Sequence, residues 1–97
     1  MTSLIQLSLW NNSLSGPIPS TIGNLSNMKH LALSSNKLSG PILPSTIGNL
    51  LPLDSLYLCS NKLNGPIPST IGNLSNLMSL DLNSNKLNGE LSSSIAT

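Results

Sequence analysis

The sequence predicts a solenoid of four stacked turns, because one segment of the chain is repeated several times. NGPIPSTIGNLSNL at residues 64–77 recurs almost unchanged as SGPIPSTIGNLSNM at 15–28, and with one added residue as SGPILPSTIGNLLPL at 39–53. The period is 24, 25 and 24 residues, measured between Asn12, Asn36, Asn61 and Asn85. A fixed period of this length is typical of architectures in which each copy buries its apolar side only against its neighbours. We therefore expect one domain over residues 1–97, with repeats at approximately 1–24, 25–49, 50–73 and 74–97.

Leucines at two fixed positions predict a strand in every copy. The pairs Leu7 and Leu9, Leu31 and Leu33, Leu56 and Leu58, and Leu80 and Leu82 each precede a marker asparagine. Spacing of two residues directs both side chains to the same face of an extended segment. Neighbouring turns are then expected to pair as parallel strands, roughly 4.8 Å apart, in a short sheet on the concave face.

The asparagine that follows each strand is expected to have a structural role. If its amide turns inward, it can satisfy backbone groups that the bend leaves unpaired, and such groups are costly to bury without a partner. This hypothesis covers Asn12, Asn36, Asn61 and Asn85.

The rest of each copy is expected to return along the convex face as extended and 3₁₀ segments. Glycine at positions 16, 40, 65 and 89 permits a tight corner, and the prolines that follow favour an extended path. STIGNL then predicts a short helical piece, with Ser20, Ser45 and Ser69 as candidate caps. Leu43 is the expected insertion in the longer copy.

The pattern LxxLxLxxNxLxGxIPxxIGxLxxL, which covers essentially the whole chain, resembles the plant extracellular type of leucine-rich repeat. The fold class that this implies is a leucine-rich repeat solenoid. The resemblance is to an internal ectodomain segment of a leucine-rich repeat receptor-like kinase or receptor-like protein, in signalling or defence. It implies an extracellular or cell-surface location and a peptide or protein ligand or co-receptor as partner. Secreted members of the family, such as polygalacturonase inhibitors, bind proteins without a kinase.

Cysteine usage departs from that family pattern. The plant extracellular type usually has cysteine-paired caps at both ends of the solenoid, whereas this chain has one cysteine, Cys59. We therefore expect an internal piece of a longer solenoid or a truncated gene product. Uncapped apolar ends also predict end-to-end association.

Composition argues against several other classes of function. Only 7% of the residues are charged and the net charge is +1, which is unlike a nucleic-acid binder. No apolar run is long enough to predict a membrane segment. The first ten residues, MTSLIQLSLW, have no basic region and align with the repeat, so we do not predict a signal peptide.

Catalysis is not predicted. His30 precedes the second leucine pair and Cys59 follows the third, so the two lie well over 10 Å apart at roughly 3.3 Å per strand residue. Asp81 lies two turns from His30, too far for a triad. Metal-ligand spacing and phosphate-binding loops are absent from the sequence, and we expect no cofactor and no metal.

Residues beside the inward leucines differ between copies, and they are expected to face outward from the concave sheet. Both aromatic residues of the chain are among them, and Trp and Tyr often anchor protein interfaces. We predict a docking surface for a peptide or protein, centred on Tyr57 with Trp10, His30 and Asp81 around it. The complete candidate set is Trp10, His30, Ser34, Tyr57, Cys59, Asp81 and Asn83. Drift on a solvated face is the alternative.

Two further patterns lie outside that set. Lys37, Lys62 and Lys86 occupy one column, either as a solvated edge or as a surface for an acidic partner. Glycosylation sequons begin at Asn11, Asn24 and Asn73. Modification is expected at Asn24 or Asn73, whereas a glycan on Asn11 would obstruct the concave face.

Ice binding and a fragment without independent function remain as alternatives. Some plant antifreeze proteins are also leucine-rich repeat solenoids. A regular column of small polar residues could match an ice surface, and two columns qualify: Ser20, Ser45, Ser69 and Ser93, and Thr21, Thr46 and Thr70.

Overall fold

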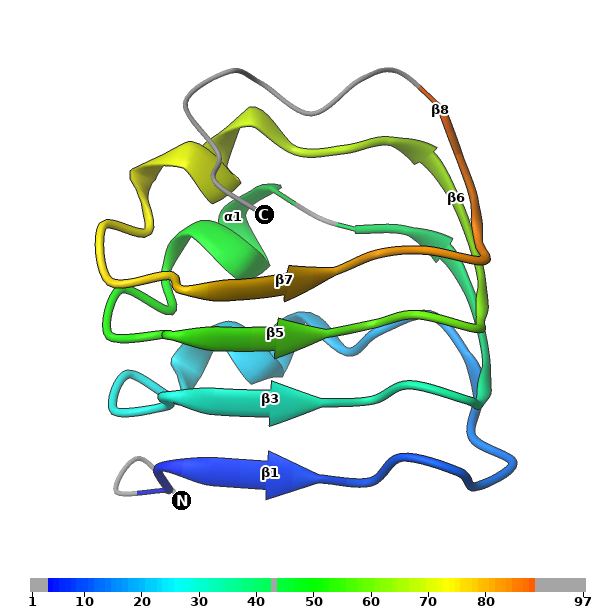
Figure 1. Ribbon diagram of the computed structural model, residues 1–97, viewed down its shortest axis with the longest axis horizontal. Coiled ribbons are helices and arrows are strands. Elements are labelled where there is room, and N and C mark those ends of the chain that lie inside the picture. The colour runs from blue at the N-terminus through cyan, green and yellow to red at the C-terminus, as the bar shows by residue number, and fades with distance from the viewer. Residues whose placement is uncertain (1–3, 43, 89–97) are drawn as a thin grey trace.

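The computed structural model describes residues 4–42 and 44–88 and shows a solenoid with two parallel sheets (Figure 1). The first sheet consists of β1 (Gln6–Ser8), β3 (His30–Ala32), β5 (Ser55–Tyr57) and β7 (Ser79–Asp81), in that order. The second consists of β2 (Ser15–Gly16), β4 (Lys37–Pro41), β6 (Lys62–Pro66) and β8 (Lys86–Asn88). The predicted solenoid with its short parallel sheet is therefore confirmed.

The second sheet was not predicted as a sheet. The sequence predicted only an extended return path for these segments, yet they pair in order β2-β4-β6-β8. The glycines in this region explain why the path can turn, because Gly16, Gly40 and Gly65 have φ of +80°, +79° and +81°. A residue with a Cβ atom is strained in that left-handed region.

The registers of the two sheets differ in an informative way. In the first sheet each residue pairs with its repeat equivalent, as in Gln6 with His30 and Leu31 with Leu56. In the second sheet Ser15 pairs with Lys37 and Ser39 pairs with Lys62, two residues before the equivalent position. Equivalent residues are therefore displaced by two residues, roughly 6.6 Å, along the second sheet at each turn.

In the part of the chain that the structure describes, three short helical segments form the remaining side of the coil. The first and third are 3₁₀ helices, η1 (Ser20–Asn24) and η2 (Ser69–Asn73), whereas the longer copy forms an α-helix, α1 (Pro44–Gly48). The predicted capping serines are wrong for η1 and η2, because Pro19 and Pro68 occupy the N-cap positions and no side chain caps either helix. Leu43, Gly89 and Ser93 lie outside the described residues.

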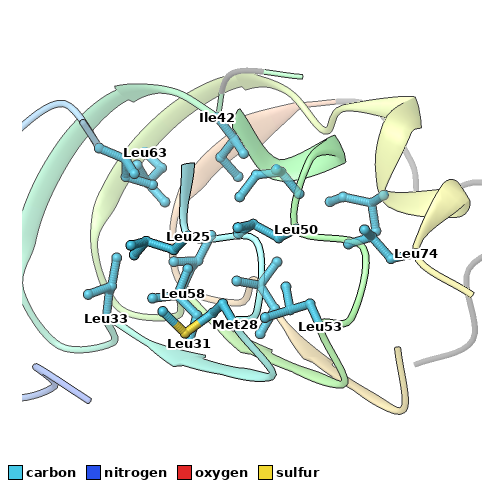
Figure 2. Close-up of a cluster of buried hydrophobic side chains, with 14 of the residues drawn as sticks. Leu25, Met28, Leu31, Leu33, Ile42, Leu50, Leu53, Leu58, Leu63 and Leu74 are labelled. Atoms are coloured by element: carbon cyan, nitrogen blue, oxygen red, sulfur yellow. The ribbon is translucent and has the colours of Figure 1, made fainter. Parts of the chain in front are cut away.

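The core is a stack of aliphatic side chains enclosed by the two sheets and the helical side (Figure 2). Met28, Leu31, Leu53 and Leu56 are completely buried in the middle turns. The equivalent side chains of the first and last turns, such as Leu7 and Leu80, are only partly buried. Burial thus depends on having a turn on both sides, as expected for a repeat protein. None of the helices in the described residues has the length and apolar character that a membrane span requires.

Candidate functional site: a hollow on the first sheet

A ladder of asparagine side chains, of which Asn36 and Asn61 are buried, joins neighbouring turns. Asn61 Nδ2 donates to the carbonyl oxygens of Leu33, Leu58 and Cys59 at 3.0–3.2 Å. Its Oδ1 accepts from the backbone N–H of Leu38 at 3.0 Å. The same pattern is made by Asn36 and Asn85, whereas the amide of Asn12 donates to the carbonyl oxygens of Leu9 and Trp10 in its own turn.

The residue before each ladder asparagine has an unusual backbone conformation. Four such residues have φ between +58° and +60°: Asn11, Ser35, Ser60 and Ser84. Few residues with a Cβ adopt this region, but Asn tolerates it. Backbone bonds hold the bend in place, because Asn11 N–H donates to Ser34 O and Ser35 N–H donates to Cys59 O. The bend at the end of each of the first three strands of the first sheet is therefore hydrogen-bonded to the next turn.

A hollow of about 550 Å³ lies on the outer surface of the first sheet. It forms because the second turn has the small residues Ala32 and Ser34, whereas Trp10 stands on the first turn and Tyr57 on the third. Two strand steps separate the two aromatic residues, a lateral distance of roughly 10 Å. Trp10 is 60% exposed and Tyr57 38% exposed, so both rings are available to a ligand. The lining residues are Gln6, Leu7, Ser8, Trp10, His30, Ala32, Ser34, Ser55, Tyr57 and Cys59.

A close polar contact that the sequence did not predict lies at one end of the hollow. His30 Nδ1 lies 2.9 Å from Asp54 Oδ1, and Ser55 Oγ donates to the same carboxylate oxygen at 2.9 Å. Asp54 directly precedes β5, and His30 pairs with Ser55 in the sheet, so the register alone could have identified it. The serine hydroxyl contacts the carboxylate rather than the imidazole. This arrangement is therefore not that of a catalytic triad, in which the histidine bonds to the nucleophile.

At the other end of the hollow, Ser34 and Cys59 are hydrogen-bonded to each other. Ser34 is buried, and its Oγ accepts from Cys59 N–H at 3.2 Å and lies 3.1 Å from Cys59 Sγ. Among the described residues, no hydrogen bond joins Cys59 to His30. Ser34 was expected to project from the sheet as a contact residue, but it lies in the floor because Trp10 and Tyr57 rise on either side.

The predicted set is thus divided by the structure. Trp10, His30, Ser34, Tyr57 and Cys59 meet at one hollow, whereas Asp81 and Asn83 do not line it. Asp81 pairs with Tyr57 in the sheet, and its Oδ1 accepts from Asn83 N–H at 3.1 Å. Asn83 instead lines a second hollow of about 310 Å³, beside the partly buried core leucines of the last described turn.

The other candidate positions differ in exposure. Asn11, Asn24 and Asn73 are all exposed, as an acceptor of a glycan has to be. Thr46 is only 4% exposed, so the predicted threonine column is not a continuous outer surface. The reason is packing, because η1 lies against α1 and Gly23 approaches the Thr46 backbone so closely that a Cβ would be 3.2 Å away. No cluster of metal-ligating side chains occurs in the part of the chain that the structure describes.

Comparison with known proteins shows the family. The family model described as leucine rich repeat matches residues 2–63, and a second leucine-rich repeat model matches 76–97. The chain is 44% identical over 57 residues to receptor kinase-like protein Xa21 of Oryza sativa subsp. japonica. The aligned segment covers 58% of this chain and 5% of the relative.

Solved structures agree with this assignment. The plant peptide hormone receptor RGFR1, solved in complex with RGF2, aligns with a TM-score of 0.91 and 46% identity over 97% of this chain and 15% of the receptor chain. A plant ice-binding protein aligns with a TM-score of 0.83 and 40% identity over 87% of this chain and 27% of its own. The chain therefore spans a small part of the proteins that it resembles, and it belongs to the leucine-rich repeat family.

Proposed function

We propose that the chain is a non-catalytic, peptide-binding segment of the extracellular part of a plant receptor-like kinase or receptor-like protein. The observation that carries the proposal is the hollow between Trp10 and Tyr57 on the first sheet. Support also comes from the similarity to a plant peptide hormone receptor solved in complex with RGF2. The partner in this proposal is a peptide, or a co-receptor that presents an extended segment.

The shape of the hollow suggests how a peptide binds. Tyr57 is in register with Ser8, so Trp10 lies two strands away and two residues further along, and the two Cα atoms are roughly 12 Å apart. This leaves room for one apolar side chain between the two exposed rings, above Ala32 and Ser34. Tyr and Trp contribute most when they are desolvated at the centre of an interface. His30 and Asp54, whose side chains lie 2.9 Å apart, provide polar groups beside the apolar part. We therefore expect a peptide that crosses the strands and inserts one apolar residue, with polar residues toward His30.

The test is to fill the hollow without changing the core. Ala32→Phe adds a ring on the outer face of β3, between Trp10 and Tyr57. Ser79→Phe is the matched control, because it adds the same ring to the outer face of β7 at a position that does not line the hollow. Both variants and the unmodified protein are compared for binding to a display library of random peptides. We expect a set of peptides that binds the unmodified protein and Ser79→Phe but not Ala32→Phe.

Two results would contradict the proposal: selection of no peptide by the unmodified protein, or equal binding of the selected peptides by Ala32→Phe. Far-ultraviolet circular dichroism of Ala32→Phe separates a blocked hollow from a misfolded chain. A Trp10→Ala variant adds a second measurement, for which we expect roughly a thirtyfold or greater loss, as for an aromatic hot spot.

Ice binding is the second candidate, because one similar solved structure is that of a plant ice-binding protein. The threonine column cannot serve, since Thr46 is buried. The candidate ice surface is therefore reduced to exposed serines such as Ser20 and Ser69. Inhibition of ice recrystallisation by the purified chain, lost when both serines are replaced by Tyr, would support this function over peptide binding.

A further inference from the structure

Three lysines lie in a row on the outer face of the second sheet. Lys37, Lys62 and Lys86 begin β4, β6 and β8, and all three are exposed. The next residue in the first two strands, Leu38 and Leu63, is buried, so the lysines project away from the core. Figure 1 shows β6 and β8 along the right-hand side of the solenoid, on a different side from the first sheet with its hollow.

The register of the second sheet sets the spacing of this lysine row. Lys62 pairs with Ser39 and Lys86 pairs with Asn64, so each lysine is one strand over and two residues further along than the one before. The strand spacing of about 4.8 Å and a shift of about 6.6 Å combine to about 8 Å between successive Cα atoms. Without the two-residue shift the same lysines would be only about 4.8 Å apart, and their mutual repulsion would be greater.

Each lysine has a neutral hydrogen-bonding neighbour on the preceding strand. Ser15 pairs with Lys37, Ser39 with Lys62 and Asn64 with Lys86. Residues in register on parallel strands share a face, so a residue with a hydroxyl or an amide lies beside the base of every lysine side chain. A carboxylate that meets the lysine therefore has a second donor within the same site, repeated three times along the row.

The charge of the lysine row is not neutralised by the acidic residues that the structure describes. Asp54 and Asp81 both lie at the first sheet, where Asp54 pairs with His30 and Asp81 bonds to Asn83. Neither forms an ion pair with any of the three lysines. Lys29, the fourth basic residue, lies just before β3 at the other sheet. Positive charge is thus concentrated on one side of the described solenoid.

We propose that the lysine row is a second docking surface, which binds an extended acidic peptide segment. Charge complementarity supplies the attraction, and alternate side chains of an extended peptide lie about 6.6 Å apart, within reach of flexible lysines at about 8 Å. Anionic lipid is a poorer match, since membrane recognition generally uses four to eight basic residues. This surface is separate from the hollow and does not depend on the function proposed for it.

The experiment uses a fluorescent synthetic peptide with Glu at every second position, followed by anisotropy at low ionic strength. We expect saturable binding that is weakened roughly threefold by Lys62→Gln, and by roughly thirtyfold when all three lysines are replaced by Gln, as for exposed ion pairs. Binding is expected to be lost near 1 M salt, where screening acts over about 3 Å. The same peptide with Gln in place of Glu is expected not to bind.

Lys29→Gln is the matched control, because it removes the same charge from the other sheet. An equal loss of binding in Lys29→Gln and Lys62→Gln would overturn the proposal, since only net charge would then matter. Absence of any binding by the Glu peptide would overturn it as well. A uronate or sulfated oligosaccharide that binds more tightly than the peptide, and with the same dependence on Lys62, would assign the row to a carbohydrate instead.

Discussion

The most specific quantitative prediction concerns the asparagine ladder. Asn61 connects two turns because its side chain forms hydrogen bonds to backbone groups of both. Asn61 is 9% exposed, donates to three carbonyl oxygens and accepts from Leu38 N–H. The amide has two donor hydrogens, so the set amounts to about three hydrogen bonds. At about 1–1.5 kcal/mol for each bond lost or left unsatisfied, Asn61→Ala is expected to lower the free energy of unfolding by about 3–4.5 kcal/mol.

Asn12→Ala provides the matched control within the same molecule. Asn12 is exposed, and its amide donates to Leu9 O and Trp10 O in its own turn, so its loss is expected to cost about 1 kcal/mol or less. The assay is urea unfolding of both variants and the unmodified chain, followed by circular dichroism. Equal destabilisation by the two variants, or a cost below about 1 kcal/mol for Asn61→Ala, would refute the inference that inter-turn hydrogen bonds make the ladder strong.

The remaining predictions concern packing, the helical side and modification. Leu56→Ala removes a completely buried side chain in the third turn and is expected to cost about 2–5 kcal/mol in the same urea assay. Gly23→Ala is expected to lower the melting temperature, because a Cβ would lie 3.2 Å from the Thr46 backbone; an unchanged melting temperature would contradict the tight contact of η1 with α1. Expression in a secretory eukaryotic host is expected to add glycans to the exposed Asn24 and Asn73, and mass spectrometry of Asn24→Gln and Asn73→Gln variants checks each site.

The sequence predicted the solenoid and its first sheet because both depend on a period and on alternating leucines, which are local and repeated. The pairing of Lys62 with Ser39 could not be predicted, since the two-residue shift arises from how whole turns stack. The burial of Thr46 has a similar origin in the contact between neighbouring helical segments. A repeat pattern relates equivalent positions, so contacts between non-equivalent residues of neighbouring turns could not be predicted from it.

The same limit applies to the candidate site. Trp10 and Tyr57 were identified because aromatic residues on a variable sheet face are conspicuous in the sequence. Asp54 was missed, because it lies before the strand and reaches His30 on the neighbouring turn. Asp81 was included on the strength of its column, although the hollow depends on small residues in the second turn and does not extend to the fourth.

Intrinsic fluorescence tests peptide binding at the hollow most directly, because Trp10 is the only tryptophan of the chain and stands on the wall of the hollow. A peptide selected by the unmodified protein is titrated while its binding is followed in parallel by calorimetry. We predict a saturable blue shift of the Trp10 emission with the calorimetric affinity, and no shift in Ala32→Phe. Calorimetric binding that leaves the Trp10 emission unchanged would place the peptide elsewhere and contradict the proposed function of the hollow.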